Sequence, residues 1–309
     1  MKAVSRVLPC LVLLLASLPA AGEQWRHRLY GVEDGLPSSE IHDIQQDASG
    51  RLWLATRGGI ADYDGLAWRD YGMAEGLSWA DMSALRFAPD GELFCISERQ
   101  PYHIFRARGG RFELMAVNDA PPRSAELTGF EVLSAGDATP RVVMGTRDHG
   151  LFVLGDSGWR HFTEEQGLAG RRVNALAFYQ GQLLVAGRDQ LLRLAGDHLE
   201  PALTTPLPSE IGGLSVEHFA GGSSLWLVGR DWIGRARGNL QTFGLLGSQL
   251  DFAWPAWPSA MALAADRLDG LYVGHAGGLY SFHPSSGATR FNVGSGEESI
   301  QGLLVGLAL

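Results

Sequence analysis

A short apolar segment recurs six times along this chain at nearly constant spacing. In each copy a run of large apolar residues leads to a small residue, as in Leu225-Trp226-Leu227-Val228-Gly229. The aligned residues of the copies, which we call the anchors, are Trp53, Phe94, Val143, Leu184, Trp226 and Tyr272. Successive anchors lie 41 to 49 residues apart. A period of this length predicts a repeat architecture in which each unit packs against its neighbours.

The first repeat has four short β-patterned runs separated by glycine-containing turns. The runs are Ile41–Asp47, Arg51–Thr56, Ile60–Asp64 and Trp68–Tyr71. Four strands in roughly 44 residues are typical of one β-propeller blade. No window sustains the 3.6-residue period of a helical solenoid, and a β-sandwich would not repeat its sequence. The sequence therefore predicts an all-β propeller of four-stranded blades. Trp53, Trp68, Trp159 and Trp226 occupy repeat positions and are expected in its core.

The first 22 residues have the three parts of a secretory signal peptide. Lys2 and Arg6 give a positive start, Val7–Leu18 is apolar, and Ala20-Ala21-Gly22 supplies small residues for cleavage after Gly22. The apolar part is too short to span a bilayer. We expect a periplasmic or secreted product comprising residues 23–309, with Cys95 as its single thiol.

Composition and motifs argue against several classes of function. The formal net charge is −9, and removing Lys2 and Arg6 makes it more negative, which disfavours nucleic acid as a partner. The chain has no nucleophile-elbow serine motif, phosphate loop, zinc-binding helix motif or Cys-x-x-Cys. We therefore predict no catalytic residue, no metal site and no cofactor.

Three segments of the first repeat carry a resemblance to a known family. Gly35-Leu36-Pro37-Ser38, Gln46–Trp53 and Tyr63-Asp64-Gly65 resemble the two-component regulator propeller repeat. Gly-Leu recurs in register at Gly76-Leu77 and Gly167-Leu168, each time five residues after an aromatic residue. The resemblance implies a seven-bladed ring and a role as the periplasmic sensor region of bacterial hybrid histidine kinases or diguanylate cyclases.

Six repeats cover Trp25–Phe291, and the chain ends about where a seventh would start, at Leu307-Ala308-Leu309. We therefore expect an incomplete seven-bladed ring, truncated in the seventh blade. Arg28–Tyr30 would be the strand that closes the ring, and a ring left open would expose strand edges prone to association.

A candidate ligand site follows from blade topology. The turn between the second and third strands lies on the same face as the link into the next blade. Four of the six turns carry Arg four residues after the anchor, and aromatic or histidine side chains lie nearby. Guanidinium groups bind carboxylates, and indole rings stack on sugars. The candidate ligand-binding residues are Arg57, Arg147, His149, Arg188, Arg230, Trp232, Trp254, Trp257 and His275. The alternative is that these arginines simply pair with nearby acidic residues.

Three functions are compatible with these patterns. The first is a sensory module that binds an oligosaccharide or other small ligand and signals through a membrane-spanning partner or a C-terminal continuation. The second is a periplasmic scaffold that binds a protein partner. The third is a propeller enzyme that acts on a polysaccharide or lactone, although no acid/base pair stands out.

Overall fold

The computed structural model divides the chain into two units, residues 1–30 and 31–309. The residues that the structure describes are 30–97, 102–115, 122, 124–134, 141–219, 222–238, 240, 243–248, 262–265, 270–275, 278–284 and 287–291. The expected signal peptide, nearly all of the expected closing strand Arg28–Tyr30, and the expected start of a seventh blade lie outside these residues. No helix in the described part is long and apolar enough to cross a bilayer.

The described strands form antiparallel sheets of four strands each, six in all. The strands of the first three sheets are β1 (Ile41–Gln46), β2 (Leu52–Thr56), β3 (Gly59–Tyr63), β4 (Trp68–Tyr71), β5 (Met82–Phe87), β6 (Leu93–Ser97), β7 (Ile104–Arg108), β8 (Arg111–Leu114), β9 (Leu127–Ser134), β10 (Arg141–Thr146), β11 (Leu151–Gly155) and β12 (Gly158–Phe162). Those of the other three are β13 (Ala175–Tyr179), β14 (Gln182–Ala186), β15 (Leu191–Ala195), β16 (His198–Pro201), β17 (Ile211–Phe219), β18 (Gly222–Gly229), β19 (Trp232–Arg237), β20 (Gly244–Ser248), β21 (Ala262–Ala265), β22 (Leu271–His275), β23 (Gly278–His283) and β24 (Gly287–Phe291).

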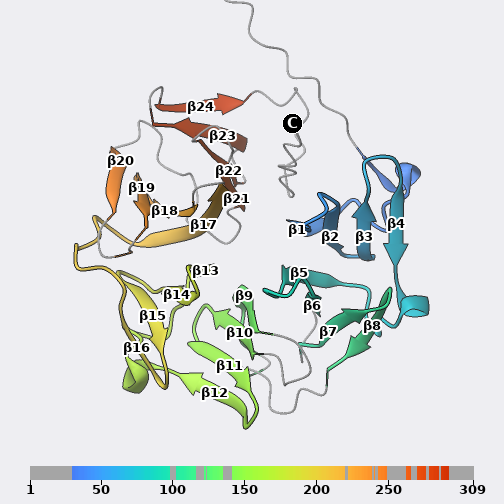
Figure 1. The fold of residues 1–309 in the computed structure, drawn as a ribbon, viewed down its shortest axis with the longest axis horizontal. Coiled ribbons are helices and arrows are strands. Elements are labelled where there is room, and N and C mark those ends of the chain that lie inside the picture. The colour runs from blue at the N-terminus through green and yellow to red at the C-terminus, as the bar shows by residue number, and fades with distance from the viewer. Residues whose placement is uncertain are drawn as a thin grey trace, which may run out of the picture. The chain divides into compact units, whose positions relative to one another are not determined.

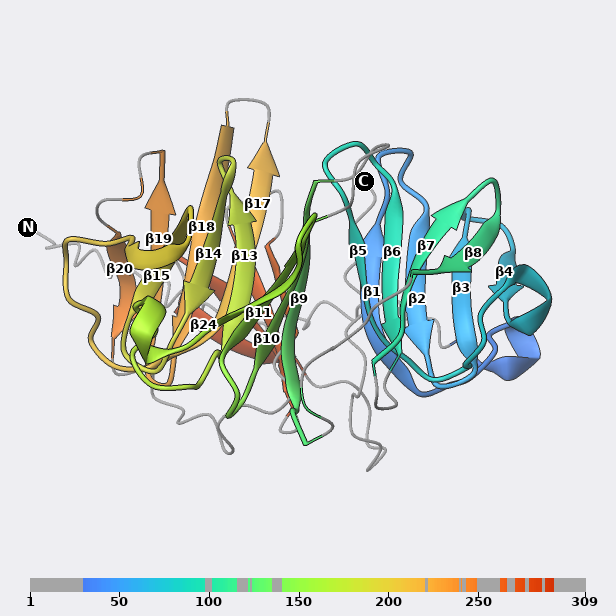
Figure 2. The ribbon, with the colours of Figure 1, turned by 90° about the horizontal axis from the view of Figure 1, so that it is seen from below.

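Within each sheet the strands follow chain order, and the first strand lies innermost (Figure 1). The first strands of consecutive sheets pack on one another, from β1 against β5 to β17 against β21. In the view of Figure 2 the strands of neighbouring sheets stand side by side. All six anchors lie in the second strand of their sheet. The predicted all-β propeller fold of four-stranded blades is thus confirmed.

The recurring Gly-Leu motif ends a short 3₁₀ helix in three links between sheets. These helices are η1 (Val32–Asp34), η2 (Met73–Glu75) and η3 (Glu164–Gln166). Gly76 has a φ of 104°, and a Cβ there would lie 2.1 Å from the carbonyl oxygen of Phe112 in β8. Only glycine combines this left-handed backbone with so close an approach. The leucine that follows each glycine is buried, so the motif fixes each link against the next sheet.

The apolar core consists of clusters that fill the spaces between consecutive sheets. In β6, Phe94 packs toward the third sheet, whereas Cys95 packs toward the first. This alternation follows from the two-residue period of a strand with both faces covered. Trp226 is fully buried, as predicted for the repeat tryptophans. Trp53, Trp68 and Trp159 are only partly buried, the last two on the outermost strands β4 and β12.

A charged chain links the innermost strands of the first three sheets. Arg86 of β5 donates to Asp43 of β1 at 2.6 Å and to Glu131 of β9 at 3.1 Å. Burial raises the pKa of Glu131 despite the opposing effect of Arg86. Because one guanidinium compensates carboxylates from two neighbouring sheets, these contacts hold three blades together near the centre.

Candidate functional site

One face of the propeller carries both the turns between second and third strands and the links into the first strands; we call it the link face. Equivalent backbone hydrogen bonds in two sheets show that the turns and the links lie together on this face. The Arg57 amide donates to the Glu40 carbonyl at 3.1 Å, and the Arg147 amide donates to the Glu126 carbonyl at 3.0 Å. Glu40 and Glu126 immediately precede β1 and β9. The predicted placement of turns and links on one face therefore holds in both sheets.

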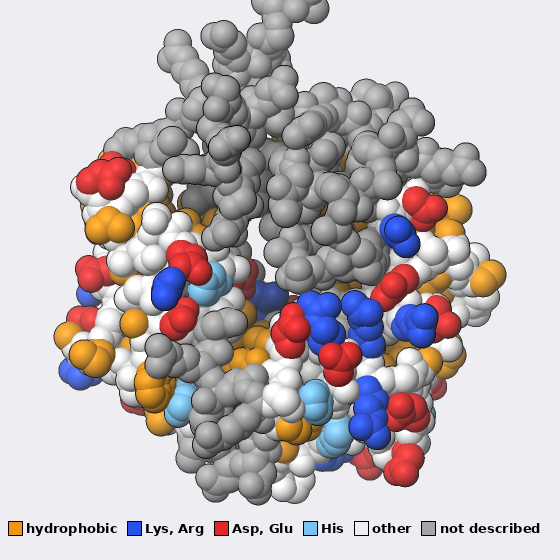
Figure 3. All heavy atoms as spheres, turned by 180° about the vertical axis from the view of Figure 1, so that it is seen from behind, with side chains coloured by type: hydrophobic (Ala, Val, Ile, Leu, Met, Phe, Trp, Pro, Cys, Tyr) orange, Lys and Arg blue, Asp and Glu red, His pale blue; other side chains and the backbone are white. Residues whose placement is uncertain are grey.

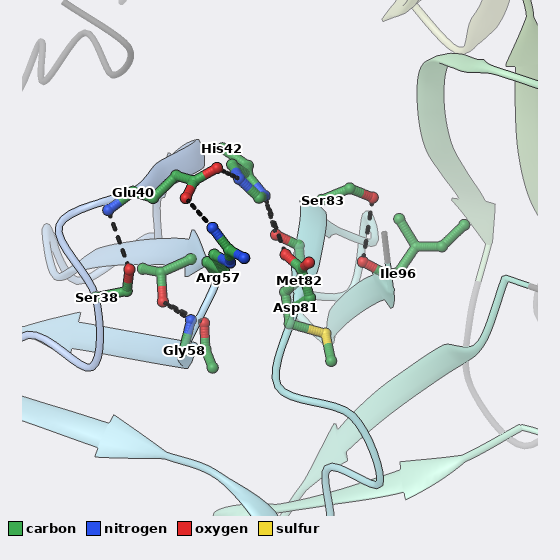
Figure 4. A network of polar contacts seen from close by, with 11 residues as sticks. Ser38, Glu40, His42, Arg57, Gly58, Asp81, Met82, Ser83 and Ile96 are labelled. Atoms are coloured by element: carbon green, nitrogen blue, oxygen red, sulfur yellow. Dashed lines mark hydrogen bonds and ion pairs between the residues drawn. The ribbon is translucent and has the colours of Figure 1, made fainter. Parts of the chain in front are cut away.

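Arg57 lies in a polar network at the boundary of the first two sheets (Figure 4). Its guanidinium Nη1 donates to Glu40 Oε2 at 3.1 Å, and both side chains are exposed. The hydrogen bond from Arg57 holds the pKa of the Glu40 carboxyl below its usual range. Arg57 was predicted as a ligand-binding group, and the structure places it against a carboxylate of its own sheet.

His42 extends this network to the second sheet. Its Nδ1 lies 2.9 Å from the Met82 carbonyl oxygen and 3.8 Å from Asp81 Oδ1. Its Nε2 lies 3.5 Å from Glu40 Oε1. The side chain of His42 thus bridges β1 to the start of β5 (Figure 4), which is a structural role.

Arg147 in the third sheet is held even more tightly. Its Nε and Nη2 donate to the two carboxylate oxygens of Glu126 at 2.7 and 2.6 Å. This hydrogen bonding raises the pKa of Arg147. The alternative reading of the turn arginines, pairing with acidic residues, therefore describes Arg57 and Arg147.

Arg188 and Arg230 differ from these two. Both side chains are exposed, and among the described residues neither has an ion-pair or hydrogen-bond partner. They occupy the equivalent turns of the fourth and fifth sheets, after β14 and β18. Figure 3 shows acidic and basic side chains next to one another around the centre, so positive charge on this face is confined to small areas.

The prediction that Trp232 stacks on a ligand is wrong. Trp232 is 1% exposed, and its Nε1 donates to Ser209 Oγ at 3.0 Å. The ring packs in the core between the fourth and fifth sheets, tilted against Phe243. Trp232 is the first residue of β19 rather than part of the turn, and its side chain faces the neighbouring sheet.

Three other predicted aromatic or histidine residues cannot be placed. Trp254 and Trp257 lie outside the described residues. His275 ends β22, but its side chain is not among those described. A further link tryptophan, Trp79, is 39% exposed before β5, and its ring centroid lies 5.6 Å from that of His103. The sequence already places Trp79 in a link on the same face as the turn arginines.

His149 and Ser124 lie close enough to hydrogen-bond, but the described residues supply no third group that would orient the histidine for catalysis. His149 Nε2 lies 3.2 Å from Ser124 Oγ. The other ring nitrogen, Nδ1, is buried and has no hydrogen-bond partner within the described residues. A catalytic histidine needs a third group to orient it. No cluster of His, Cys, Asp and Glu suited to a metal ion occurs in the described part of the chain.

Residues 35–58 match the family model described as "Two component regulator propeller". This segment contains Gly35-Leu36 and runs through β1 and β2 to the turn after β2. The resemblance predicted from the sequence motifs is therefore confirmed over this repeat. The chain matches no curated protein sequence.

Three solved structures share the fold. The extracellular domain of a putative hybrid two-component system from B. thetaiotaomicron has a TM-score of 0.60 and 18% identity, covering 87% of this chain and 35% of that one. YCF48 from Cyanidioschyzon merolae, a protein also solved bound to a D1 peptide, has a TM-score of 0.53 and 15% identity, covering 84% and 87%. A GH74 enzyme from Niastella koreensis has a TM-score of 0.55 and 12% identity, covering 81% and 45%.

At these identities the likeness concerns the fold alone. The chain spans about a third of the length of the two-component-system domains that it matches.

Proposed function

We propose that this chain, which carries a two-component regulator propeller repeat at residues 35–58, is the sensory part of a bacterial signal-transduction protein. Its parent would be a two-component sensor kinase or a diguanylate cyclase. The observation that carries the proposal is this repeat within a propeller whose anchors recur in every described sheet. A ring of seven blades, as the resemblance implies, is part of the proposal.

The proposed ligand is an oligosaccharide bound on the link face. That face carries two kinds of group with which proteins bind sugars. These are the exposed guanidinium donors of Arg188 and Arg230 and the partly exposed indole of Trp79. Guanidinium groups hydrogen-bond hydroxyl and carboxylate oxygens, and an indole presents an apolar surface to a sugar ring. Turns on a rigid β-scaffold are also where recognition is usually found.

The proposed location is the periplasm or the cell exterior. Met1–Gly22 has the composition of a cleavable signal peptide. The matched two-component-system structures are described as extracellular domains. In such a compartment the propeller would meet a ligand before any membrane-spanning partner transmits the signal.

A second candidate is binding of a protein partner, favoured by exposed apolar side chains at the periphery of the first two sheets. Val32 of η1 is 60% exposed, Met73 of η2 is 81% exposed and Leu114 of β8 is 51% exposed. The enzymatic alternative lacks comparable support in the described residues.

The test is to measure binding of the purified chain, with its signal peptide removed, to neutral and acidic oligosaccharides by calorimetry. Binding that weakens on Trp79→Ala but not on Trp68→Ala supports a link-face sugar site, since Trp68 lies on the outermost strand β4. Binding unaffected by Trp79→Ala, or absent for every oligosaccharide, would contradict the proposal.

A further inference from the structure

The link face differs between its sheets at one equivalent position. Glu40 and Asp81 lie four residues after Leu36 and Leu77 of the Gly-Leu motif, and each immediately precedes a first strand. Four residues after Leu168 stands Arg172. The fourth sheet therefore carries a cation where the first and second carry carboxylates.

Side-chain contacts between sheets support this alignment. The residue two positions after the carboxylate reaches the backbone of the next sheet: His42 contacts Met82 O at 2.9 Å, and Thr128 Oγ1 donates to Val173 O at 2.7 Å. Asn174, two positions after Arg172, donates to Ile211 O at 2.8 Å. Glu40, Glu126 and Arg172 are thus equivalent in three dimensions as well.

The substitution leaves Arg188 without the carboxylate that its counterparts have. In the first and third sheets the turn arginine pairs with the residue before the first strand. In the fourth sheet the equivalent residue is Arg172, and a Cβ on Gly187, beside Arg188, would lie 3.9 Å from the Arg172 carbonyl oxygen. Like charges thus occupy the two positions that elsewhere form an ion pair.

The fifth sheet supplies a carboxylate at this position, Glu210, but Glu210 faces the fourth sheet. Its Oε1 accepts from Asn174 Nδ2 at 3.0 Å and lies 3.9 Å from Arg172 Nε. Asn174 Oδ1 in turn accepts from Arg172 Nε at 2.9 Å. Because Glu210 is held in this way, Arg230 has no carboxylate partner among the described residues.

Two acidic residues moderate the local charge. Asp189 and Asp231 follow Arg188 and Arg230 in their turns, and Asp231 Oδ1 accepts from Ser209 Oγ at 3.2 Å. Neither forms an ion pair with a turn arginine within the described part of the chain. Arg188 and Arg230 are therefore exposed and have no ion-pair partner among the described residues.

From this arrangement we infer that the turn arginines Arg188 of the fourth sheet and Arg230 of the fifth sheet bind carboxylates of an acidic oligosaccharide. The inference rests on the proposed function and specifies the ligand's charge. The external carboxylate takes the place that Glu126 occupies beside Arg147, where two hydrogen bonds of 2.7 and 2.6 Å show that the turn geometry accepts a carboxylate. Planar two-point pairing of this kind is the form in which guanidinium recognises carboxylates.

The test compares trigalacturonate with its neutral methyl ester, each titrated by calorimetry into the chain lacking its signal peptide. The wild-type protein should bind the acid more tightly than the ester. Arg188→Ala/Arg230→Ala should weaken acid binding roughly 10- to 100-fold, the range for lost charge-assisted hydrogen bonds. Arg57→Ala, which removes an arginine already paired with Glu40, is the control and should change the affinity less than about twofold.

Arg172→Glu tests the origin of the site. It should restore the ion pair with Arg188 and so reduce the preference for the acid over the ester, leaving the contribution of Arg230. Arg171→Glu makes the same change of charge one residue earlier, at a 65% exposed side chain, and should weaken acid binding less than about threefold because exposed charges are screened. Thermal unfolding of each variant verifies that it is folded.

Acid binding that survives Arg188→Ala/Arg230→Ala, or that falls equally in Arg57→Ala, would overturn this inference while leaving an oligosaccharide sensor intact. Equal affinity for acid and ester would do the same. Absence of binding to either form, together with no binding to any neutral oligosaccharide, would contradict both the inference and the proposed function.

Discussion

The guanidinium of Arg147 and the carboxylate of Glu126 form a two-point ion pair across the link face, although 21 residues separate them in sequence. Glu126 is 57% exposed, whereas Arg147 is 23% exposed. A turn arginine on this face is therefore not by itself a ligand-binding group. A turn arginine is paired where the link before its sheet places a carboxylate beside it and, among the described residues, is unpaired where the link does not.

Glu126→Gln should convert the third sheet into a further acidic-ligand site. Removing the charge of Glu126 frees Arg147 for an external carboxylate, so affinity or stoichiometry for trigalacturonate should rise a few-fold in calorimetry. The free energy of unfolding should fall by less than about 1 kcal/mol, because the pair is partly exposed. Unchanged acid binding in Glu126→Gln would indicate that free turn arginines do not recruit carboxylates.

Gly76→Ala should destabilise the fold strongly. Its Cβ would meet the Phe112 carbonyl at 2.1 Å, and its φ of 104° is unfavourable for alanine. We expect a loss of more than about 2 kcal/mol, measured by denaturant unfolding. Gly91→Ala is the matched control: its φ is 86°, but nothing lies within 4 Å of the added Cβ. Similar losses for both variants would mean that the close approach to β8 has no role.

The propeller fold could be predicted because its determinants are local and repeated. Each anchor lies in a strand whose two faces are both covered. The sequence must therefore supply a run of apolar residues once in every repeat. Gly76 and Gly167 could be recognised as link positions for the same reason: their backbone conformation and close contacts require glycine in each copy.

The candidate site was predictable only in part, because its chemistry depends on contacts between segments. Glu40 lies 17 residues from Arg57, and the sequence does not show that their side chains meet. Trp232 was misassigned because the turn after Gly229 is only two residues long, so Trp232 is already the first residue of β19, where alternate side chains face the core. The alignment of Arg172 with Glu40 was visible in the Gly-Leu repeats, but its meaning required the pairing of Arg57.

Tyr71 should titrate at unusually high pH. Its hydroxyl donates to Asp62 Oδ2 at 2.6 Å, and burial, followed by this contact with Asp62, raises the pKa of Tyr71 to about 12. Because the folded pKa exceeds the ordinary value of 10.0, the stabilisation is complete below pH 10 and is lost as the pH rises toward 12.

Ultraviolet titration of tyrosinate in wild type and Tyr71→Phe checks this prediction, since the difference isolates one tyrosine. A difference spectrum with a midpoint near pH 10 would contradict it. At neutral pH, Tyr71→Phe should lose about 1 kcal/mol, the typical value of one hydrogen bond.

Arg86→Leu should weaken the contact among the first three sheets. It leaves the carboxylates of Asp43 and Glu131 without their shared cation, at a cost of about 3 kcal/mol in the free energy of unfolding at pH 7. Because burial already raises the pKa of Glu131, protonation should relieve this loss, so the variant should be less destabilised at pH 5. Arg69→Leu, at an exposed position of β4, should stay within about 0.5 kcal/mol of wild type. A destabilisation of Arg86→Leu that is the same at both pH values would contradict the role of the carboxylates.

Hydrogen–deuterium exchange with and without trigalacturonate shows directly whether the ligand binds on the link face. With ligand, exchange should be slower in the turns at residues 187–190 and 229–231, where Arg188 and Arg230 are exposed. Exchange should not change in the opposite-face turns at residues 47–51 and 88–92, which join β1 to β2 and β5 to β6. Protection confined to the opposite-face turns, or to none of these segments at saturating ligand, would contradict binding on the link face.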